Sequence, residues 1–246
     1  MKWLLPFLIL GTTNSLGWSL TLSDLLTRTR VYLRDTNSDP LLQRFSDTQL
    51  TRFFNDGQDE INIQTWVVIS STRINLLPGT TEYSLTSDFI LPLRVTVNNR
   101  PIVERTFSFL DASQTDWVSS SGTPDSFYVR VDSSLVAGVS RESIGFVPVS
   151  TFSMTADVQF LANPVDLSAS GDTAFGSDNF RLVSFHPVLC YYGAYRGFLA
   201  MGMVDEAALY YREYVNMTAL MESVVKSRLS FNPSFRGVIQ GPKPSQ

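Results

Sequence analysis

Residues 89–105 read FILPLRVTVNNRPIVER, and this stretch decides the class of fold. A run of apolar and β-branched residues leads to the pair Asn98–Asn99, and a second short run returns from it. Two asparagines between such runs are typical of a tight hairpin turn, because this turn needs residues that tolerate a positive φ. The stretch therefore predicts a strand, a turn and a returning antiparallel strand.

A period of two residues extends outward from this hairpin in both directions, from Ser70 to Asp166. Other short strand-like runs are TRINLLPG, TEYSL, SFYVRVDSS, SIGFVPVS and MTADVQFLA. About seven short strands with turn signals between them predict an antiparallel β-sandwich or barrel-like insert over residues 70–168. The polar stretch DASQTDWVSSSGTPD is expected to form a loop.

Helical patterns precede this insert. Residues 22–35, LSDLLTRTRVYLRD, have an amphipathic stripe, with Thr21 or Ser23 as the capping residue. In FSDTQL, Ser46 is followed three residues later by Gln49, which is the pattern of a capping box and predicts a second helix to about residue 68. Residues 21–69 are thus expected to supply the N-terminal helices of a helical body.

Two further helical patterns follow the insert. Residues 179–202 and 204–230 predict a pair of long helices separated near Gly202, an αα-hairpin within residues 177–228 that completes the helical body. Residues 229–246 contain three prolines and are expected to form an extended tail. The predicted fold class is α+β.

Composition and motifs argue against several classes of function. The 246 residues are 43% hydrophobic and 17% charged, with a net charge of -4, so the chain is globular and has no basic excess for wrapping nucleic acid. The single cysteine excludes an internal disulfide. No phosphate loop, G-x-S-x-G or H-E-x-x-H motif occurs. We therefore expect no catalytic site, no cofactor and no metal.

The N-terminal segment, residues 1–20, leaves two interpretations open. MKWLLPFLILG has one lysine and then an apolar run, and small residues follow where a signal peptidase cleaves. This pattern is typical of a secretory signal. The alternative is an apolar arm that docks on this protein or on a neighbour.

The only histidine, His186, lies four residues before the only cysteine, Cys190. A helix would place both on one face, as in a catalytic dyad or half of a metal site. The strongly apolar surroundings favour ordinary packing instead. Asp56, Asp59 and Glu60 form a carboxylate cluster that suits a hydrolase or a cation site, but we favour a solvated helix face.

The layout and several local stretches resemble the head-to-tail adaptor (connector) proteins of tailed bacteriophages. The matching stretches are LSDLLTRTRVYLRDTNSDPLLQRFSDTQLTRFFNDGQDEI, LPGTTEYSLTSDFILPLRVTVNNRPI and HPVLCYYGAYRGFL with DEAALYYREY. The resemblance covers about Leu22 to Arg228. It carries no catalytic signature, so it implies a scaffold and not an enzyme.

The resemblance also implies a place and partners. Such adaptors form a ring, typically twelve-fold, beneath the portal protein in the neck of the virion. They assemble in the host cytoplasm. The ring extends the DNA channel without sequence-specific binding and docks tail or neck proteins, and no membrane is involved. In this family the C-terminal segment reaches the portal, which implies a binding role for Arg228, Phe231, Phe235, Arg236, Val238 and Ile239.

The alternative function is a secreted β-rich binding protein with a cleaved signal peptide. It differs from the adaptor in its mature N-terminus, which would be Trp18 after cleavage.

Overall fold

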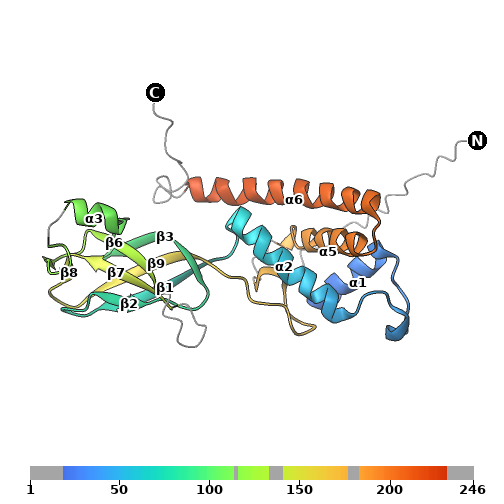
Figure 1. The fold of residues 1–246 in the computed structure, drawn as a ribbon, viewed down its shortest axis with the longest axis horizontal. Helices are drawn as coiled ribbons and strands as arrows, with labels where there is room; N and C mark the ends of the chain where they lie inside the picture. Colours follow the sequence, from blue (N-terminus) through green and yellow to red (C-terminus); the bar gives the residue numbers. More distant parts are fainter. Residues whose placement is uncertain (1–18, 114–115, 133–140, 177–182, 232–246) are drawn as a thin grey trace, which may run out of the picture. The chain divides into compact units, whose positions relative to one another are not determined.

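The computed structural model describes residues 19–113, 116–132, 141–176 and 183–231 (Figure 1). Its helices are α1 (Leu22–Leu33), α2 (Asp47–Thr65), α3 (Phe107–Ser113), α5 (Pro187–Ala200) and α6 (Val204–Phe231), with short 3-10 turns at Pro40–Leu42 and Ala174–Gly176. The described chain divides into two compact units. Unit 1 takes its residues from 1–54 and 167–213, and unit 2 takes its residues from 55–166 and 214–246, so both divisions fall within helices, α2 and α6.

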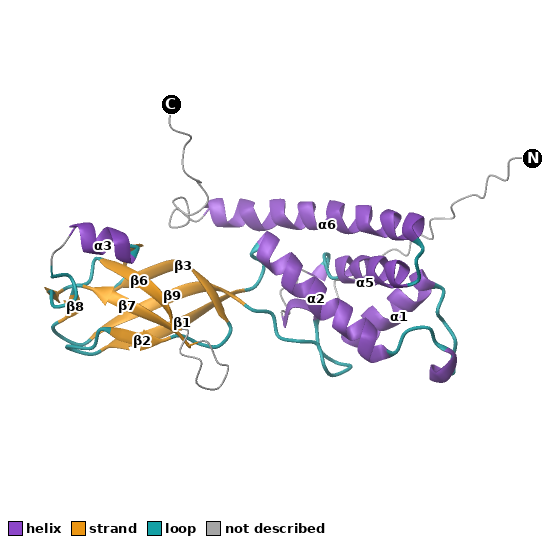
Figure 2. Ribbon diagram, viewed as in Figure 1, coloured by secondary structure: helices purple, strands orange, loops and turns teal. Residues whose placement is uncertain are grey.

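The strands all belong to unit 2, which confirms the predicted α+β class with an inserted β-domain (Figure 2). They are β1 (Ile69–Leu76), β2 (Glu82–Ser84), β3 (Phe89–Val97), β4 (Arg100–Glu104), β5 (Ser121–Gly122), β6 (Ser126–Asp132), β7 (Arg141–Val147), β8 (Val149–Ser150) and β9 (Met154–Ala162).

Both N-terminal helices begin where the sequence predicts. In α1 the backbone N–H of Asp24 donates to Thr21 Oγ1, and the N–H of Thr21 donates to Asp24 Oδ2 at 3.0 Å. In α2 the N–H of Ser46 donates to Gln49 Oε1 at 2.9 Å, and the N–H of Gln49 donates back to Ser46 Oγ. These reciprocal bonds provide acceptors for backbone N–H groups that have no partner within the first turn of a helix. Helix α2 ends at Thr65, a few residues earlier than predicted, because Trp66 turns to a φ of 56°.

The connection between α1 and α2 is fixed by a buried ion pair. Arg30 donates through Nη1 to Asp35 at 3.0 Å and through Nη2 to the carbonyl of Phe45 and to Asp47. The Asp35 carboxylate also accepts the backbone N–H groups of Arg44 and Phe45. These bonds hold both ends of the loop, Asp35 after α1 and Phe45 before α2, against the same guanidinium group.

Helices α5 and α6 form the predicted hairpin, with Gly202 at a φ of +74° in the turn between them. The first helix is shorter than predicted. It begins at Pro187, preceded by turn hydrogen bonds such as His186 N–H to Val183 C=O. Proline has no N–H to continue a helical ladder but fits the first helical position, so it sets the start. The predicted residues 179–182 lie outside the described chain.

Helix α5 packs closely on α1 and on the start of α2 at two glycines one turn apart. A Cβ on Gly193 would lie 2.6 Å from the ring of Phe54, and one on Gly197 would lie 2.7 Å from Leu33. Any larger residue would push the helices apart. This contact joins the two segments of unit 1.

The main sheet of unit 2 has seven strands in the order β1-β9-β3-β4-β6-β7-β2 and curls into a barrel-like shape (Figure 1). All its pairs are antiparallel except β4 with β6. The predicted hairpin at the Asn98–Asn99 turn is present, with both residues at positive φ, and joins β3 to β4. Inward-facing residues such as Val95, Val158, Ile144 and Phe160 form one core.

The stretch expected to be a loop contains the end of α3 and the short strand β5. A seven-residue helix has little stability of its own, so its sequence gives a weak signal. Tertiary contacts stabilise it: the rings of Phe107 and Tyr128 lie 4.8 Å apart, and those of Trp117 and Tyr128 lie 5.5 Å apart.

The buried Asp35 should contribute more to stability than the exposed Asp47, although both contact Arg30. Replacing Asp35 by Ala leaves two backbone N–H groups unpaired and a buried guanidinium half-compensated, so we expect a loss of about 3 kcal/mol in the free energy of unfolding. Asp47→Ala, the matched control, should cost about 1 kcal/mol or less. Urea unfolding of both variants measures this, and equal losses would contradict the assignment.

Candidate assembly surfaces

His186 lies at the start of α5 and is fully buried. Its Nδ1 accepts the backbone N–H of Leu20 at 3.0 Å, which places the proton of the neutral ring on Nε2. Burial lowers the pKa of His186 to about 4. A neutral histidine that holds the chain before α1 has a structural role.

Cys190 is equally enclosed, one turn along α5. Burial raises the pKa of its thiol to about 11, whereas a nucleophilic cysteine needs a lowered pKa and access to substrate. Its Sγ donates a long hydrogen bond to the carbonyl of Leu25 at 4.0 Å. His186 and Cys190 therefore act as core residues, the interpretation that the sequence favoured.

The carboxylate cluster of α2 is divided between different roles. Burial, together with the neighbouring Asp166 and Asp56, raises the pKa of Asp59. Glu60 accepts a hydrogen bond from the hydroxyl of Tyr214 at 2.9 Å. Within the described chain, no three His, Cys, Asp or Glu side chains lie close enough to hold a metal ion.

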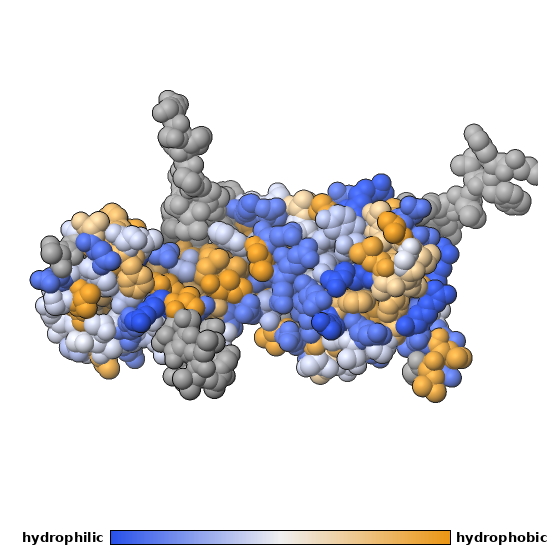
Figure 3. Space-filling view, in the orientation of Figure 1, coloured by the Kyte–Doolittle hydropathy of each residue, from blue (hydrophilic) through white to orange (hydrophobic). Residues whose placement is uncertain are grey.

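A pair of leucines projects from the loop between α1 and α2. Leu41 is 91% exposed and Leu42 is 65% exposed. Their turn is ordered by local bonds: the N–H of Leu41 donates to Asp39 Oδ1, and the N–H of Leu42 donates to the Asp39 carbonyl. Figure 3 shows apolar surface at the far end of this loop. An exposed apolar tip on an anchored loop is suited to insertion into another protein.

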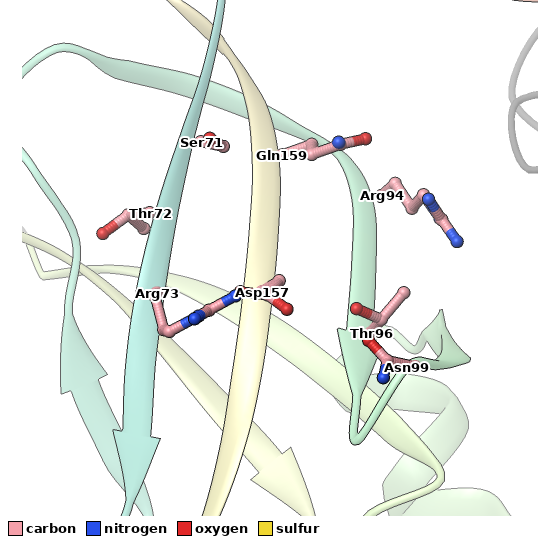
Figure 4. A pocket seen from close by; sticks show the side chains of 8 residues that line it. All are labelled: Ser71, Thr72, Arg73, Arg94, Thr96, Asn99, Asp157 and Gln159. Atoms are coloured by element: carbon pink, nitrogen blue, oxygen red, sulfur yellow. The ribbon is translucent and has the colours of Figure 1, made fainter.

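The outer face of β1, β9 and β3 carries a polar hollow of about 440 Å³ (Figure 4). Strand register aligns its side chains in two rows: Arg73, Asp157 and Thr96 in one, and Ser71, Gln159 and Arg94 in the other. In the first row Arg73 Nε donates to Asp157 Oδ1 at 2.7 Å.

The second row is not satisfied within the chain. Arg94 Nε and Gln159 Oε1 are both buried and have no hydrogen-bond partner. Figure 4 shows both side chains extending toward the same side. Buried polar atoms normally find partners, and in a polar hollow of this size ordered water is the simplest partner.

A smaller hollow of about 200 Å³ lies where α3 covers the sheet, lined by Phe107, Trp117 and Tyr128 among others. Glu82 at its edge accepts hydrogen bonds from Tyr128, Arg130 and Ser143. Its polar groups are thus satisfied internally.

The residues implied to bind the portal lie at the C-terminal end. Arg228 and Phe231 belong to the last turn of α6, which continues three residues into the expected tail. Phe235, Arg236, Val238 and Ile239 lie outside the described residues. Sequence reasoning missed the leucine tip and the polar hollow, although the adjacent leucines after Pro40 gave a local signal for the first.

In the described chain, no helix is both long enough and apolar enough to cross a membrane.

The stability of the protein should fall as the pH falls from 7 to 5. His186 is the only histidine, and its pKa of about 4 lies below the ordinary value of 6.5, so the unfolded chain binds a proton that the folded chain excludes. The expected loss is about 2 kcal/mol by pH 5. The raised pKa of Asp59, Glu104 and Glu142 works in the opposite direction, so the control is His186→Leu, measured over the same range. An identical pH dependence in wild type and variant would refute this role.

Comparison with known families identifies the chain. Curated proteins gave no match. A family model described as SU10 adaptor protein matches residues 20–235, which is most of the chain, and confirms the resemblance to phage adaptors. The protein belongs to the SU10 adaptor protein family, a family of phage head-to-tail adaptors.

Proposed function

We propose that this structural phage protein assembles into a ring, of twelve copies as in similar adaptors, beneath the portal. There it extends the DNA channel and docks neck or tail proteins. The observation that carries the proposal is the family match over residues 20–235. The site of action is the neck of the virion, and assembly takes place in the host cytoplasm.

Two features of the surface support assembly. The exposed Leu41 and Leu42 form an apolar tip, and the hollow at Arg94 contains unsatisfied polar atoms. The exposed tip is unfavourable in water and becomes favourable when another protein covers it, and the hollow offers polar side chains that another protein can contact.

The net charge of -4 supports a channel that lets DNA pass. Tight binding to phosphates requires clustered Lys and Arg, and each such contact would slow the movement of DNA. An acidic chain avoids these contacts.

We propose further that residues 229–246 bind the portal protein. Phe231, Phe235, Val238 and Ile239 would supply apolar anchors, and Arg228 and Arg236 would supply polar ones. A segment that becomes ordered on binding loses conformational entropy, so several anchors are needed to offset it.

The ring is tested by the native mass and negative-stain imaging of the purified chain, alone and mixed with the portal protein. We expect rings of full-length chains. A monomer that begins at Trp18 would instead support a secreted protein and refute the adaptor.

Removing residues 232–246, which leaves α6 whole, should abolish binding to the portal without changing the free energy of unfolding. Phe235→Ser with Val238→Ser should weaken binding by about tenfold or more, because apolar anchors dominate such contacts. Replacing Ser245 by Ala is the control. Undiminished binding of the truncated chain to immobilised portal protein would rule out this role for the tail.

A further inference from the structure

Strand β1 lies at one end of the main sheet, and β2 lies at the other. β1 pairs with β9 alone, so the barrel-like sheet is open between β1 and β2. Figure 4 shows β1 and β3 on either side of β9. β1 has eight residues and β2 only three, so β1 is the longer edge and presents the longer row of backbone groups to the opening.

Hydrogen bonds at the two ends of β1 show which backbone groups face the opening. The N–H of Ala162 donates to the C=O of Val68, so Val68 faces β9. Successive residues of a strand direct their backbone groups to opposite sides. Four residues of β1 therefore direct their N–H and C=O groups away from β9: Ile69, Ser71, Arg73 and Asn75. We call these groups the open edge.

Leu77, the next residue in this alternation, has its backbone satisfied by a side chain. Its N–H donates to the hydroxyl of Tyr83 at 2.7 Å, and that hydroxyl donates to the C=O of Leu77. Within the part of the chain that the structure describes, the open edge itself makes no comparable bond. The groups that remain form a continuous template for another strand.

β1 also lacks the features that normally protect an edge strand. It contains no proline, and its ladder with β9 has no register shift. Its one charged side chain, Arg73, pairs with Asp157 of β9. Prolines, bulges and free charges are the usual obstacles to pairing at an edge, so β1 is suited to accept an added strand.

Apolar side chains at the opening would gain from such a strand. Ile74 on β1, Tyr83 on β2 and Leu85 just after β2 pack against the core of the barrel but are only partly buried. A strand with one apolar face, added beside β1, would remove more of their surface from water.

The C-terminal tail contains a run that fits the open edge. Residues 234–240, SFRGVIQ, are seven residues between Pro233 and the pair Gly241–Pro242, which is the pattern of a bounded strand. Phe235 and Ile239 alternate with polar residues, as in a half-buried strand. The open edge spans the same length, from Ile69 to Asn75.

The tail also starts from the right part of the molecule. Val225 of α6 packs against Leu93 of β3, and the residues after Tyr214 belong to the same unit as the sheet. β1 is two strands from β3, or about 10 Å. Residues 232–246 can span about 50 Å when extended, so they reach β1. Residues 1–18 fit less well, because their apolar run has no alternating polar face.

We propose that residues 234–240 add to the open edge of their own chain as a further strand until the portal is bound. Phe235 and Ile239 then cover the apolar side chains at the opening. The same two residues are proposed anchors for the portal, so the portal must displace the strand. Only this displacement rests on the proposed function.

Amide hydrogen exchange, measured by NMR, tests the added strand in the full chain and in a chain that ends at Phe231. The amides of Ser71 and Arg73 should exchange about tenfold or more slowly in the full chain, because only there do they have acceptors. The amides of Ser70 and Thr72 face β9 in both chains and are the matched controls. Equal exchange of Ser71 and Arg73 in the two chains would overturn the proposal.

Proline variants test whether the tail binds as a strand. Of two neighbouring residues in a strand, one directs its N–H to the partner, so Val238→Pro or Ile239→Pro must break the pairing. Ser245→Pro lies beyond the run and is the control. Slow exchange of Ser71 and Arg73 in both of the first two variants would refute an added strand.

Dilution identifies the source of the strand. Protection by the same chain should not change when a monomeric sample, checked by sedimentation, is diluted tenfold, because the tail is tethered. Protection that falls on dilution would mean that another copy supplies the strand, and the proposal for the same chain would be wrong.

Adding the portal protein separates this inference from the proposed function. Bound portal should return Ser71 and Arg73 to the fast exchange of the truncated chain, and continued protection would refute the displacement. If the truncated chain binds the portal as well as the full chain does, the proposed role of the tail at the portal fails. The added strand is then decided by the exchange data alone.

Discussion

The structure depends on the close contact that α5 makes with α1 and with the start of α2. The segments that meet there are separated in the sequence by residues 55–166, so unit 1 is built from two stretches of the chain, one before the sheet and one after it. Gly193 and Gly197 permit the approach, because a Cβ at either position would fall within 3 Å of a buried side chain. The fully buried His186 and Cys190 are consequences of this packing, since both belong to the same tightly enclosed face.

Local chemistry made much of the fold predictable from sequence. The bonds that begin α1 and α2 involve residues three positions apart, so Thr21 with Asp24 and Ser46 with Gln49 can be identified without knowing the tertiary structure. The Asn98–Asn99 turn is equally local, because its residues must adopt a positive φ. These signals place the insert between two pairs of helices, which is enough to define the fold class.

Features that depend on distant residues were not predictable. Helix α3 is stabilised by Tyr128, on a strand that comes later in the chain. The polar hollow needs the register of three strands, which aligns Ser71, Gln159 and Arg94. In the sequence Arg94 is one charged residue in an alternating run, and only the paired structure shows that its Nε has no partner. The roles of the C-terminal residues remain predictions.

The way the chain enters and leaves the main sheet has a structural consequence. It enters on β1 and leaves on β9, and these strands are paired so that Ile69 lies opposite Leu161. The two ends of the sheet segment are therefore about 5 Å apart, close enough for a short peptide to join them. Another domain whose two ends lie equally close together could therefore be joined at the same two points of the chain.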